Sequence, residues 1–572
     1  MFAVLPLAGC TSTHPGPGPV PTSSRSSAPK FDLVAFDSCK QLLKELRAAA
    51  RKSYSRPVPD AGIAVDGGNR ALAAGAEAAA PAATPFSGTN VNEAGSDEPD
   101  IVKTDGRRIV TVANGVLHVI DPASRRETGR LSLGSSGQAD LLLSGDRALV
   151  LVSGFQRILE RRSLVPPSEA GAQAILVDLA GTPQVISRYR GSGRVLDARQ
   201  TGSVARVVLS SPPRFAESPD AATIDDWLPE WEVTTGGTTT KGRTACGDVS
   251  RPPSFSGLSM LSVLTFDLAA PALTDGSPVS LVADGDIVYG TPTSLYIAND
   301  QRWRIDTFRD SSAPDSEIFK FTLPPAGKPI LAATGAVPGM LLSQYSLSEW
   351  DGWLRVATTD FAQRSSAVRV FGQQGGKLVQ RGVVDGLGHG EQIYAVRFLG
   401  SRGYVVTFRQ TDPLYSLDLS DPARPRVTGD LKITGYSAHL QQVGDDRVVG
   451  IGQEADAGGV REGLQVSLFD VADPAHPTRL AQHVVPGAGS EAEYDPHALL
   501  WWPATHLLVV PTYERAIALK IEGGTLKEAG YLAGGNIRRA LVIGDRLWTL
   551  SDNELAVADL STLEPIGRVA LS

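Results

Sequence analysis

The sequence predicts an all-β fold, a single β-propeller of about eight blades in a range of roughly seven to nine, with an N-terminal amphipathic helix. Apolar strands that end in Asp recur along the chain, at Asp121, Asp178, Asp267, Asp418, Asp470 and Asp559. Between them recur Gly-Asp or Asp-Gly turns, each followed by another apolar strand. A period of roughly forty to fifty residues is typical of stacked four-stranded units. Helical periodicity is almost absent after residue 90, so the bulk of the chain is predicted to be β.

The propeller is predicted to occupy residues 89–572. Nine candidate units start near residues 101, 138, 193, 283, 340, 390, 434, 494 and 536, and an insertion at 212–256 splits the third. Closed propellers more often have seven or eight blades. We therefore take eight as the central value and nine as the literal count. Residues 31–88 show no strand that they would lend to the ring.

The first residues predict where the protein is located. Residues 7–10, Leu-Ala-Gly-Cys, have the form of a bacterial lipobox, in which a signal peptidase cuts before a Cys that then carries lipid. Residues 1–10 are thus interpreted as a shortened lipoprotein signal, and Cys10 as a membrane anchor on the extracytoplasmic side. The alternative is a chance apolar start, because no basic segment precedes it. The short leader also indicates a start assigned too far downstream or a trimmed chain.

Three segments precede the propeller. Residues 11–30 are rich in Ser, Thr, Pro and Gly and predict a disordered tether. Residues 31–52 predict a helix, capped by Asp37 and Ser38, because apolar residues recur at helical spacing, at Phe36, Leu42, Leu43, Leu46 and Ala50. Residues 53–88 return to Ala, Gly and Pro and predict a linker.

The chain contains three Cys. Acylation would remove Cys10 and leave Cys39 and Cys246 as an even pair in an oxidising compartment. A disulfide between them would close a loop of about two hundred residues, stabilise the fold by roughly 5 kcal/mol and dock the helix on the propeller. The alternative is two unrelated buried thiols. No Cys and His have the spacing of a structural zinc site.

The composition is that of a globular protein with a large core, with 42% hydrophobic and 20% charged residues. The net charge of −8 lies in no single run. Nucleic acids are excluded as partners, because their phosphates require clustered Lys and Arg.

Four segments resemble a known family. They are SGTNVNEAGSDEPDIVKTDG at 87–106, SLSEWDGWLRVATT at 346–359, GEQIYAVRFLGSRGYVVTFRQTDPLYSLDLSDPARP at 390–425 and GLQVSLFDVADPAHP at 463–477. The chain resembles, from about Cys39 onward, a bacterial family of exported C-terminal β-propeller proteins that are distantly related to WD40 repeats and often lipoproteins. The resemblance implies a propeller and export. It implies no activity, because none is assigned to that family.

This sequence departs from the family in one loop. After Gly-(Phe/Tyr)-Ser the family tends to show an aromatic residue followed by Leu-His-Pro. Here Gly435-Tyr436-Ser437 is followed by Ala438 and His439. A role for the family His in this loop is therefore left open.

A run of acidic residues precedes the first unit, at Asp97, Glu98, Asp100 and Asp105. Ca²⁺ prefers several oxygen ligands, so calcium is the one candidate cofactor. The spacing does not match an EF-hand loop. The alternative is that these carboxylates cap a blade edge or pair with Arg107 or Arg397.

Two further groups begin units and are candidate binding residues. His389, Glu391 and Arg397 open the sixth unit, and Tyr494, Asp495 and His497 open the eighth. If the units direct them toward one another, they offer acid–base chemistry or a metal site at the channel mouth. The alternative is a hydrogen-bonded loop network.

The insertion at 212–256 holds the last candidates. Residues 217–232 contain six acidic residues and no basic one, together with Trp227 and Trp231. Exposed Trp beside carboxylates predicts a recognition lip for a sugar or a cationic partner. The alternative is that both rings fold back over a blade edge.

No catalytic residue is assigned, because the sequence has no G-x-S-x-G, HExxH or P-loop and no GxGxxG after a strand. The leading hypothesis is a non-enzymatic scaffold that binds a protein or a cell-envelope glycan. The competing hypothesis is a hydrolase or lyase acting on polysaccharide or peptide at the channel mouth. Both rest on what propellers commonly do.

Overall fold

The computed structural model describes residues 34–35, 38–54, 85–135, 137–153, 171–214, 218–252, 257–299, 315–408, 412–456 and 459–571. Cys10, the predicted tether at 11–30 and most of the predicted linker at 53–88 lie outside the described residues. Within these ranges, no helix has the length and apolar character needed to span a bilayer.

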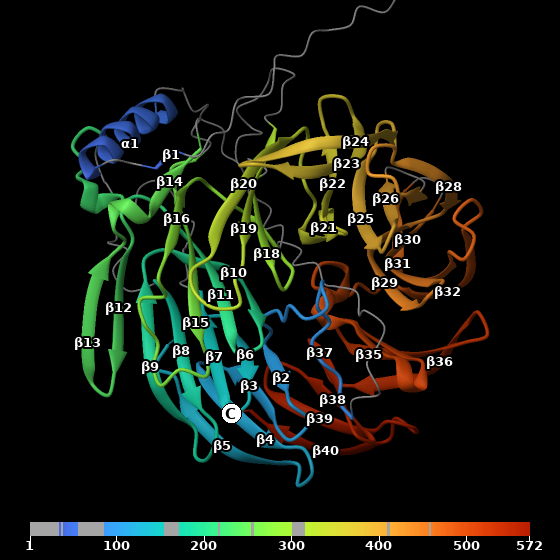
Figure 1. Ribbon diagram of the computed structural model, residues 1–572. Coiled ribbons are helices and arrows are strands. Elements are labelled where there is room, and N and C mark those ends of the chain that lie inside the picture. Colours follow the sequence, from blue (N-terminus) through green and yellow to red (C-terminus); the bar gives the residue numbers. More distant parts are fainter. Residues whose placement is uncertain are drawn as a thin grey trace, which may run out of the picture. The chain divides into compact units, whose positions relative to one another are not determined.

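The strands of the described residues form nine four-stranded antiparallel units, which we call blades one to nine (Figure 1). Blades one to three are built from β2 (Val102–Thr104), β3 (Ile109–Ala113), β4 (Val116–Asp121) and β5 (Arg126–Ser132); β6 (Ala139–Ser144), β7 (Arg147–Val152), β8 (Ala172–Asp178) and β9 (Gln184–Gly191); and β10 (Arg194–Thr201), β11 (Val204–Ser211), β15 (Met260–Asp267) and β16 (Val279–Val282).

The middle blades follow the same order of strands. Blades four to six are built from β17 (Ile287–Gly290), β18 (Ser294–Asn299), β19 (Ser316–Thr322) and β20 (Ile330–Val337); β21 (Leu347–Trp350), β22 (Trp353–Asp360), β23 (Ser365–Gln374) and β24 (Lys377–Leu387); and β25 (Gln392–Leu399), β26 (Arg402–Phe408), β27 (Asp412–Asp418) and β28 (Arg426–Ile433). A bridge from β20 to β24 joins blades four and five into one sheet.

The last blades come from the C-terminal part of the chain. Blades seven to nine are built from β29 (Tyr436–Gly444), β30 (Arg447–Ala455), β31 (Arg461–Asp470) and β32 (Thr478–Pro486); β33 (Leu500–Trp502), β34 (Leu507–Pro511), β35 (Arg515–Glu522) and β36 (Thr525–Ala533); and β37 (Arg539–Ile543), β38 (Arg546–Leu550), β39 (Glu554–Asp559) and β40 (Pro565–Ala570).

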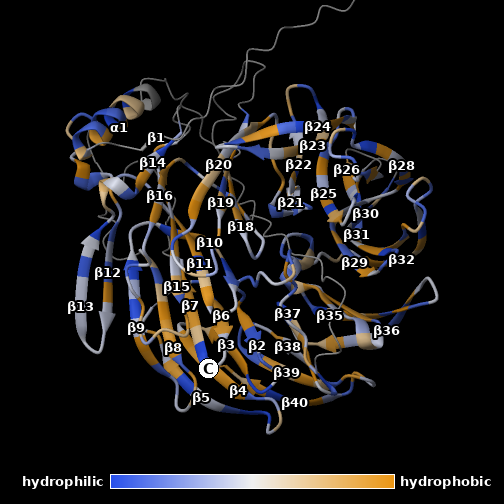
Figure 2. Cartoon of the chain, viewed as in Figure 1, coloured by the Kyte–Doolittle hydropathy of each residue, from blue (hydrophilic) through white to orange (hydrophobic). Residues whose placement is uncertain are grey.

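The nine blades close into a ring. Each of nine apolar clusters in the described residues spans two consecutive blades. One of them joins the first blade to the ninth, where Ile109 and Ile120 pack with Leu541, Trp548 and Val557. The apolar strands β7, β8, β11 and β15 stand out in Figure 2. The predicted all-β propeller is therefore confirmed, and the blade number lies at the upper end of the predicted range.

The recurring Asp residues form the turns that follow the third strands. Each stands at the end of the third strand of its blade and accepts a hydrogen bond from a backbone N–H two or three residues later, as Asp178 does from Ala180 at 2.9 Å and Asp470 from Ala472 at 2.9 Å. This is the Asx turn that Asp favours. In blades two, six, seven and nine an Arg opens the second strand directly opposite this Asp in the ladder, and Arg147 contacts Asp178 at 2.8 Å. The repeated Asp therefore has a structural role within its blade.

The predicted amphipathic helix is confirmed as α1 (Cys39–Tyr54), but its predicted start at residue 31 is wrong, because Val34–Ala35 forms a strand and the helix begins at Cys39. Ser38 caps it, since its Oγ accepts a hydrogen bond from the N–H of Gln41 at 3.2 Å. Leu42 and Leu46 are fully buried in a cluster with Trp227 of the insertion. The predicted disulfide is also present, between Cys39 and Cys246, so the helix is covalently joined to the insertion.

The segments before the ring do lend short strands, contrary to expectation. β1 (Val34–Ala35) pairs with β14 (Val249–Arg251), which extends blade three. Phe86 bridges to Ile543 of blade nine. Two residues of pairing are too few to give a periodic signal in the sequence. The insertion also adds the hairpin β12 (Glu230–Thr235) and β13 (Thr238–Arg243) to blade two.

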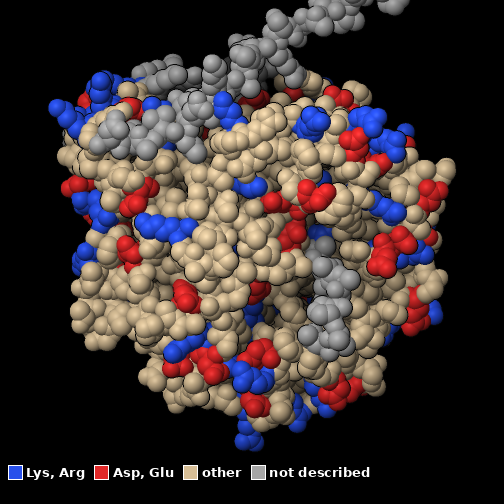
Figure 3. Space-filling view, viewed as in Figure 1, with Lys and Arg blue, Asp and Glu red and all other residues tan. Residues whose placement is uncertain are grey.

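Charged side chains of both signs interleave on the surface in view in Figure 3, without one continuous patch of either sign. Several other charged groups are buried inside the ring, among them Glu98, Arg199, Arg397 and Arg539. Burial makes ionised groups costly unless they are paired. These side chains define the interior of the site.

Candidate functional site

Residues 87–100, which we call the channel segment, run across the middle of the ring. This short stretch hydrogen-bonds to residues that begin or form the innermost strands of seven blades: two, three, four, five, seven, eight and nine. The partners are Leu141, Gln200, Tyr289, Gln344, Gln441, His497 and Arg539. A segment of this length can touch so many blades only where they converge. It therefore closes the central channel.

Glu98 is the hub of the channel segment. One carboxylate oxygen accepts from the backbone N–H of Asn92 at 3.0 Å, and the other from Gln344 Nε2 at 3.1 Å. Arg199 lies 3.8 Å away. Burial alone would raise the pKa of Glu98, but Arg199 and His497 outweigh it and lower the pKa to about 2. The group is thus ionised at any physiological pH.

His497 is the second member of this pair. Its Nε2 lies 3.1 Å from Glu98 Oε2. Burial acts to lower its pKa, but the hydrogen bond to Glu98 and the charges of Asp100 and Asp495 raise it to about 9. The imidazole is therefore protonated at neutral pH and cannot serve as a general base there.

Arg539 ties the other end of the channel segment to the last blade. Its Nε donates to Asp100 at 2.7 Å and its Nη2 to Asp495 at 2.6 Å. Arg539 is 4% exposed, so its charge-assisted hydrogen bond to Asp100 is buried and the one to Asp495 is partly buried. The carboxylates of Asp100 and Asp495 are held in one geometry as a result.

The four acidic residues that sequence analysis offered for calcium do not face one another as one ligand set. Asp97 pairs with Lys103 at 2.7 Å, and Asp105 with Arg107 and Arg108 at 3.1 Å each. Glu98 and Asp100 take the partners described above. Across the described ranges, no three His, Cys, Asp or Glu gather as a group able to hold a metal ion. In the structure these carboxylates pair with nearby cations, which was the alternative interpretation of the acidic run.

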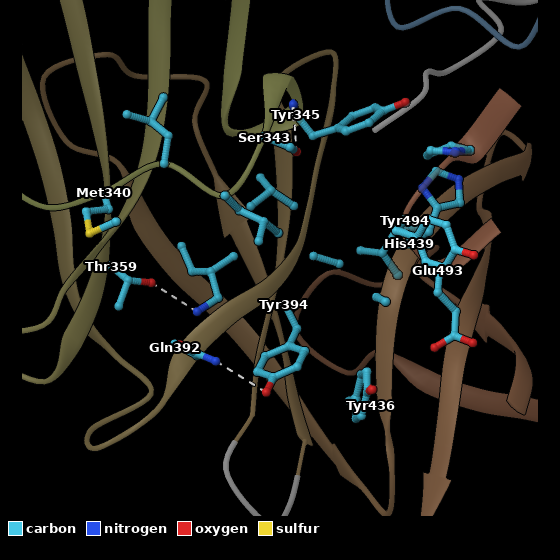
Figure 4. A pocket seen from close by; sticks show the side chains of 18 of the residues that line it. Met340, Ser343, Tyr345, Thr359, Gln392, Tyr394, Tyr436, His439, Glu493 and Tyr494 are labelled. Atoms are coloured by element: carbon cyan, nitrogen blue, oxygen red, sulfur yellow. Dashed lines mark hydrogen bonds between the residues drawn. The ribbon is translucent and has the colours of Figure 1, made fainter. Parts of the chain in front are cut away.

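A pocket of about 520 Å³ opens where the innermost strands of blades five to eight begin. Four tyrosines line it, Tyr345, Tyr394, Tyr436 and Tyr494, and we call it the tyrosine pocket (Figure 4). The carbonyl of Pro496, another lining residue, accepts from Asn90 of the channel segment at 3.2 Å. The channel segment thus holds one lining residue of the pocket through a hydrogen bond to its backbone.

Two β-bulges shape this pocket. The ladder between β25 and β26 slips at Tyr394, and the ladder between β29 and β30 slips at Ala438. A bulge inserts one unpaired residue and re-aims side chains, and bulges are common beside functional sites. Both bulged residues line the tyrosine pocket. The rings of Tyr394 and Tyr436 meet with centroids 4.7 Å apart.

Two titratable groups line the pocket with opposite shifts. Burial, aided by the charge of Arg397, lowers the pKa of His439 to about 3, so this imidazole is neutral. Burial raises the pKa of Glu493, although Ser490 and Gln453 donate hydrogen bonds to it. Figure 4 shows His439, Tyr494 and Glu493 on one side of the pocket and Tyr394 on the other.

The structure brings some of the predicted site residues together and separates others. Arg397, Asp495 and His497 belong to the buried network around Glu98. Tyr494 lines the tyrosine pocket. His389 is exposed on the turn between β24 and β25, and Glu391 accepts a hydrogen bond from Thr407 within blade six at 2.5 Å. Within the described ranges, neither residue forms a hydrogen bond or an ion pair with the network.

The predicted recognition lip is not formed at Trp227. That ring is 3% exposed and packs against α1, so it covers a blade edge, as the alternative interpretation held. Trp231 is half-buried and packs over Gly242 of the neighbouring strand β13. Sequence reasoning placed Trp by composition alone, and composition does not tell which face of a hairpin is covered.

Tyr345, Tyr394, Tyr436 and His439 are site residues that sequence reasoning missed as a set. Three of them follow the turns that open new blades, where an aromatic residue interrupts the apolar pattern. That signal is faint, because aromatic residues are also ordinary strand formers.

The beta propeller domain model matches residues 86–563 of the chain. The chain belongs to the beta propeller domain family. The matched range starts at the channel segment and ends within blade nine, so it covers both the ring and the site.

Two relatives of this propeller are archaeal. An uncharacterized protein of Archaeoglobus fulgidus is 29% identical over 612 residues, covering 94% of each chain. An uncharacterized protein of Methanocaldococcus jannaschii is 34% identical over 241 residues, which is 41% of this chain and 38% of that relative. The match thus spans well under half of the second relative's length.

Solved structures resemble the propeller distantly. Citrobacter koseri AztD has a TM-score of 0.39 and 10% identity, covering 83% of this chain and 94% of that one. BamB from Moraxella catarrhalis has a TM-score of 0.31 and 13% identity, covering 65% and 86%.

Proposed function

We propose that this protein is a lipid-anchored, extracytoplasmic binding protein that holds its ligand in the tyrosine pocket. The single observation that carries the proposal is the pocket itself: a concavity of about 520 Å³, lined by four tyrosines and a few polar side chains. Binding sites for small molecules have this size and this mixture of apolar walls and placed polar groups.

Rigidity beneath the pocket supports a binding role. The charges of the channel segment are paired with Arg199, His497 and Arg539, so they are committed to holding the blades together. A preorganised site loses little conformational entropy when its ligand binds. The buried charges are in this view the support of the site and have no part in chemistry.

The proposed address rests on Cys10 and on the disulfide. A bridge between Cys39 and Cys246 is typical of proteins in oxidising compartments. The lipid anchor is tested by expressing the protein behind a lipoprotein signal peptide and labelling the cells with a palmitate analogue. Label on the wild type and none on Cys10→Ser supports the anchor, and equal label on both contradicts it.

The ligand is sought in an envelope extract, with residues 31–572 as bait, because they form one compact unit. The matched control is Ala438→Trp, which fills the pocket from the bulge of β29 and leaves the surface elsewhere unchanged. A molecule retained by the wild type and absent from Ala438→Trp supports the pocket. Equal recovery by both baits would move the binding function to another surface.

One observation favours a hydrolase or lyase as a second candidate. A neutral His439 and a Glu493 with a raised pKa line the same pocket. An environment that shifts the pKa values of two groups in opposite directions is typical of acid–base pairs. Incubating the extract with wild type and with Glu493→Gln separates the two ideas. New products that appear with wild type alone favour the enzyme, whereas an intact retained ligand favours binding.

A further inference from the structure

The tyrosine pocket contains two buried polar atoms with no hydrogen bond of ordinary geometry among the described residues, although the Arg397 guanidinium lies near one of them, the Tyr345 hydroxyl. They are the hydroxyl of Tyr345 and Nε2 of His439, in side chains 5% and 4% exposed. Their rings meet edge to face with centroids 5.9 Å apart. Buried polar atoms are rarely left unpaired, because each loses its bond to water. A group from outside the chain is therefore expected between them.

The chemistry of the two atoms limits what that group is. His439 is neutral, so Nε2 is either a donor or an acceptor according to its tautomer. The Tyr345 hydroxyl both donates and accepts. A ligand hydroxyl can donate to one and accept from the other in either tautomer. A carboxylate only accepts and an ammonium only donates, so each satisfies fewer arrangements.

The charges around the pocket favour a neutral ligand. Arg461 stands over the ring of Tyr436, 5.5 Å from its centroid, and would repel a cation. Glu493, which also lines the pocket and interacts with Arg461, would repel an anion while it is ionised. One charge of each sign lines the pocket among the described residues. Arg397 is not a lining residue, but its charge acts on both Tyr345 and His439. Glu93 and Glu98 counter that charge, so the surroundings as a whole prefer neither sign.

The remaining walls combine aliphatic side chains with the rings of Tyr394 and Tyr436, which also contact Phe408 outside the lining. Tyr394, Tyr436 and Phe408 form a ring cluster with centroid distances of 4.7 to 5.4 Å. Tyr combines a flat apolar face with a polar tip, which suits molecules that are apolar on their faces and polar at their edges. A pyranose ring has that form, with C–H bonds on its faces and hydroxyls around its rim.

We propose that the tyrosine pocket binds a neutral carbohydrate, with one pyranose hydroxyl bridging the Tyr345 hydroxyl and His439 Nε2 and a ring face on the Tyr394 and Tyr436 rings. This inference rests on the proposed function, because it assumes that the pocket is the ligand site. It adds the class of ligand and the two atoms that read it.

The test uses residues 31–572 and measures binding of cellobiose, maltose and N,N′-diacetylchitobiose by ligand-observed NMR and calorimetry. Glucuronic acid and glucosamine serve as the anionic and cationic comparisons. At least one neutral disaccharide is expected to bind, and to bind more tightly than both charged sugars. Preferential binding of a charged sugar overturns the neutral class.

Tyr345→Phe removes only the hydroxyl, and His439→Phe removes the ring nitrogens. Each is expected to weaken the best neutral sugar about tenfold, in line with the loss of one buried hydrogen bond. Tyr531→Phe is the matched control, because that hydroxyl lies on β36 away from the pocket and bonds Glu528. Thermal melting of all three variants establishes that they are folded.

Monodeoxy derivatives of the best sugar identify the bridging hydroxyl. The derivative that lacks the bridging hydroxyl is expected to bind wild type more weakly than the parent sugar does. Wild type and Tyr345→Phe are expected to bind this derivative with equal affinity. If every derivative loses the same affinity for both proteins, the bridge between Tyr345 and His439 is wrong.

The two proposals fail in distinguishable ways. If no sugar binds, but the envelope extract yields a molecule that Ala438→Trp does not retain, the carbohydrate class falls and the proposed function stands. If neither sugars nor extract give a ligand that depends on the pocket, both fall.

Discussion

His497 Nε2 and Glu98 Oε2 lie 3.1 Å apart, although 399 residues separate them in the chain. This contact joins the segment that enters the ring to the residues that open blade eight. It shows that the channel segment is part of the folded ring, since Glu98 is buried, the His497 side chain is only 9% exposed, and each stabilises the charge of the other.

The first prediction concerns pH. The folded pKa of His497, about 9, lies above its usual 6.5, so its contribution is complete below about pH 6.5 and is lost as the pH rises through 9. The folded pKa of Glu98, about 2, lies below its usual 4.5, so its contribution is complete above about pH 4.5 and is lost as the pH falls through 2. The pair stabilises most between these limits.

Unfolding midpoints measured from pH 6 to 10 check this. Wild type is expected to lose stability between pH 6.5 and 9 relative to His497→Gln, whose imidazole is gone. Parallel curves for the two proteins would mean that the pair does not titrate with unfolding.

The second prediction concerns Arg539. Arg539→Met leaves Asp100 and Asp495 buried without their cation and is expected to cost about 3–5 kcal/mol. The neighbouring Arg538 is the matched control, since its side chain is 31% exposed and its contact with Glu491 is longer, at 3.5 Å. Arg538→Met should cost about 1 kcal/mol or less. Urea unfolding compares the two, and equal losses would contradict the assigned role of the buried network.

The third prediction concerns the disulfide. Cys246→Ser should release α1 from the insertion, uncover the apolar cluster around Trp227 and remove up to roughly 5 kcal/mol of stabilisation on the loop-entropy model. Hydrogen exchange in residues 39–54 should rise strongly while the blades stay protected. Non-reducing mass spectrometry of wild type should join the peptides that contain Cys39 and Cys246, and two free thiols there would overturn the docked helix.

The fourth prediction links a glycine to the pocket. A Cβ at Gly452 would collide with the backbone carbonyl of Tyr436, which cannot move aside without shifting β29. Gly452→Ala is expected to destabilise by about 2 kcal/mol or more and to abolish binding in the pocket. Gly444→Ala, where the nearest atom is 3.8 Å away, is the control and should be close to neutral. Thermal melting and ligand titration measure both, and unchanged binding by Gly452→Ala would contradict the link.

Much of the fold could be predicted because its causes are local. The Asp at the end of a third strand forms a turn with residues two or three positions later. A short stretch of sequence around Asp178 or Asp470 is therefore enough to indicate a blade. The helical spacing of Leu42 and Leu46 and the count of cysteines are local or arithmetical in the same way.

The site could be predicted only in part. Asp495 and His497 were selected because they begin a unit, and the first residues of units meet at the ring's interior. The rotation of the blades about the ring decides which of these residues contacts Glu98. It also keeps Glu391 within blade six, where it bonds Thr407. Trp227 shows the same limit, because its burial under α1 depends on a disulfide between distant residues.

The strands, their turns, the repeat and the Cys pair could be read from the amino-acid sequence, because they follow from propensity, side-chain period and composition over a few residues. The tertiary structure alone decided that there are nine blades in the described residues, that residues 87–100 close the channel, and that the bulges at Tyr394 and Ala438 open a tyrosine pocket. The physical reason is that ring closure and buried charge pairing are settled by packing between segments hundreds of residues apart, where local patterns carry no signal.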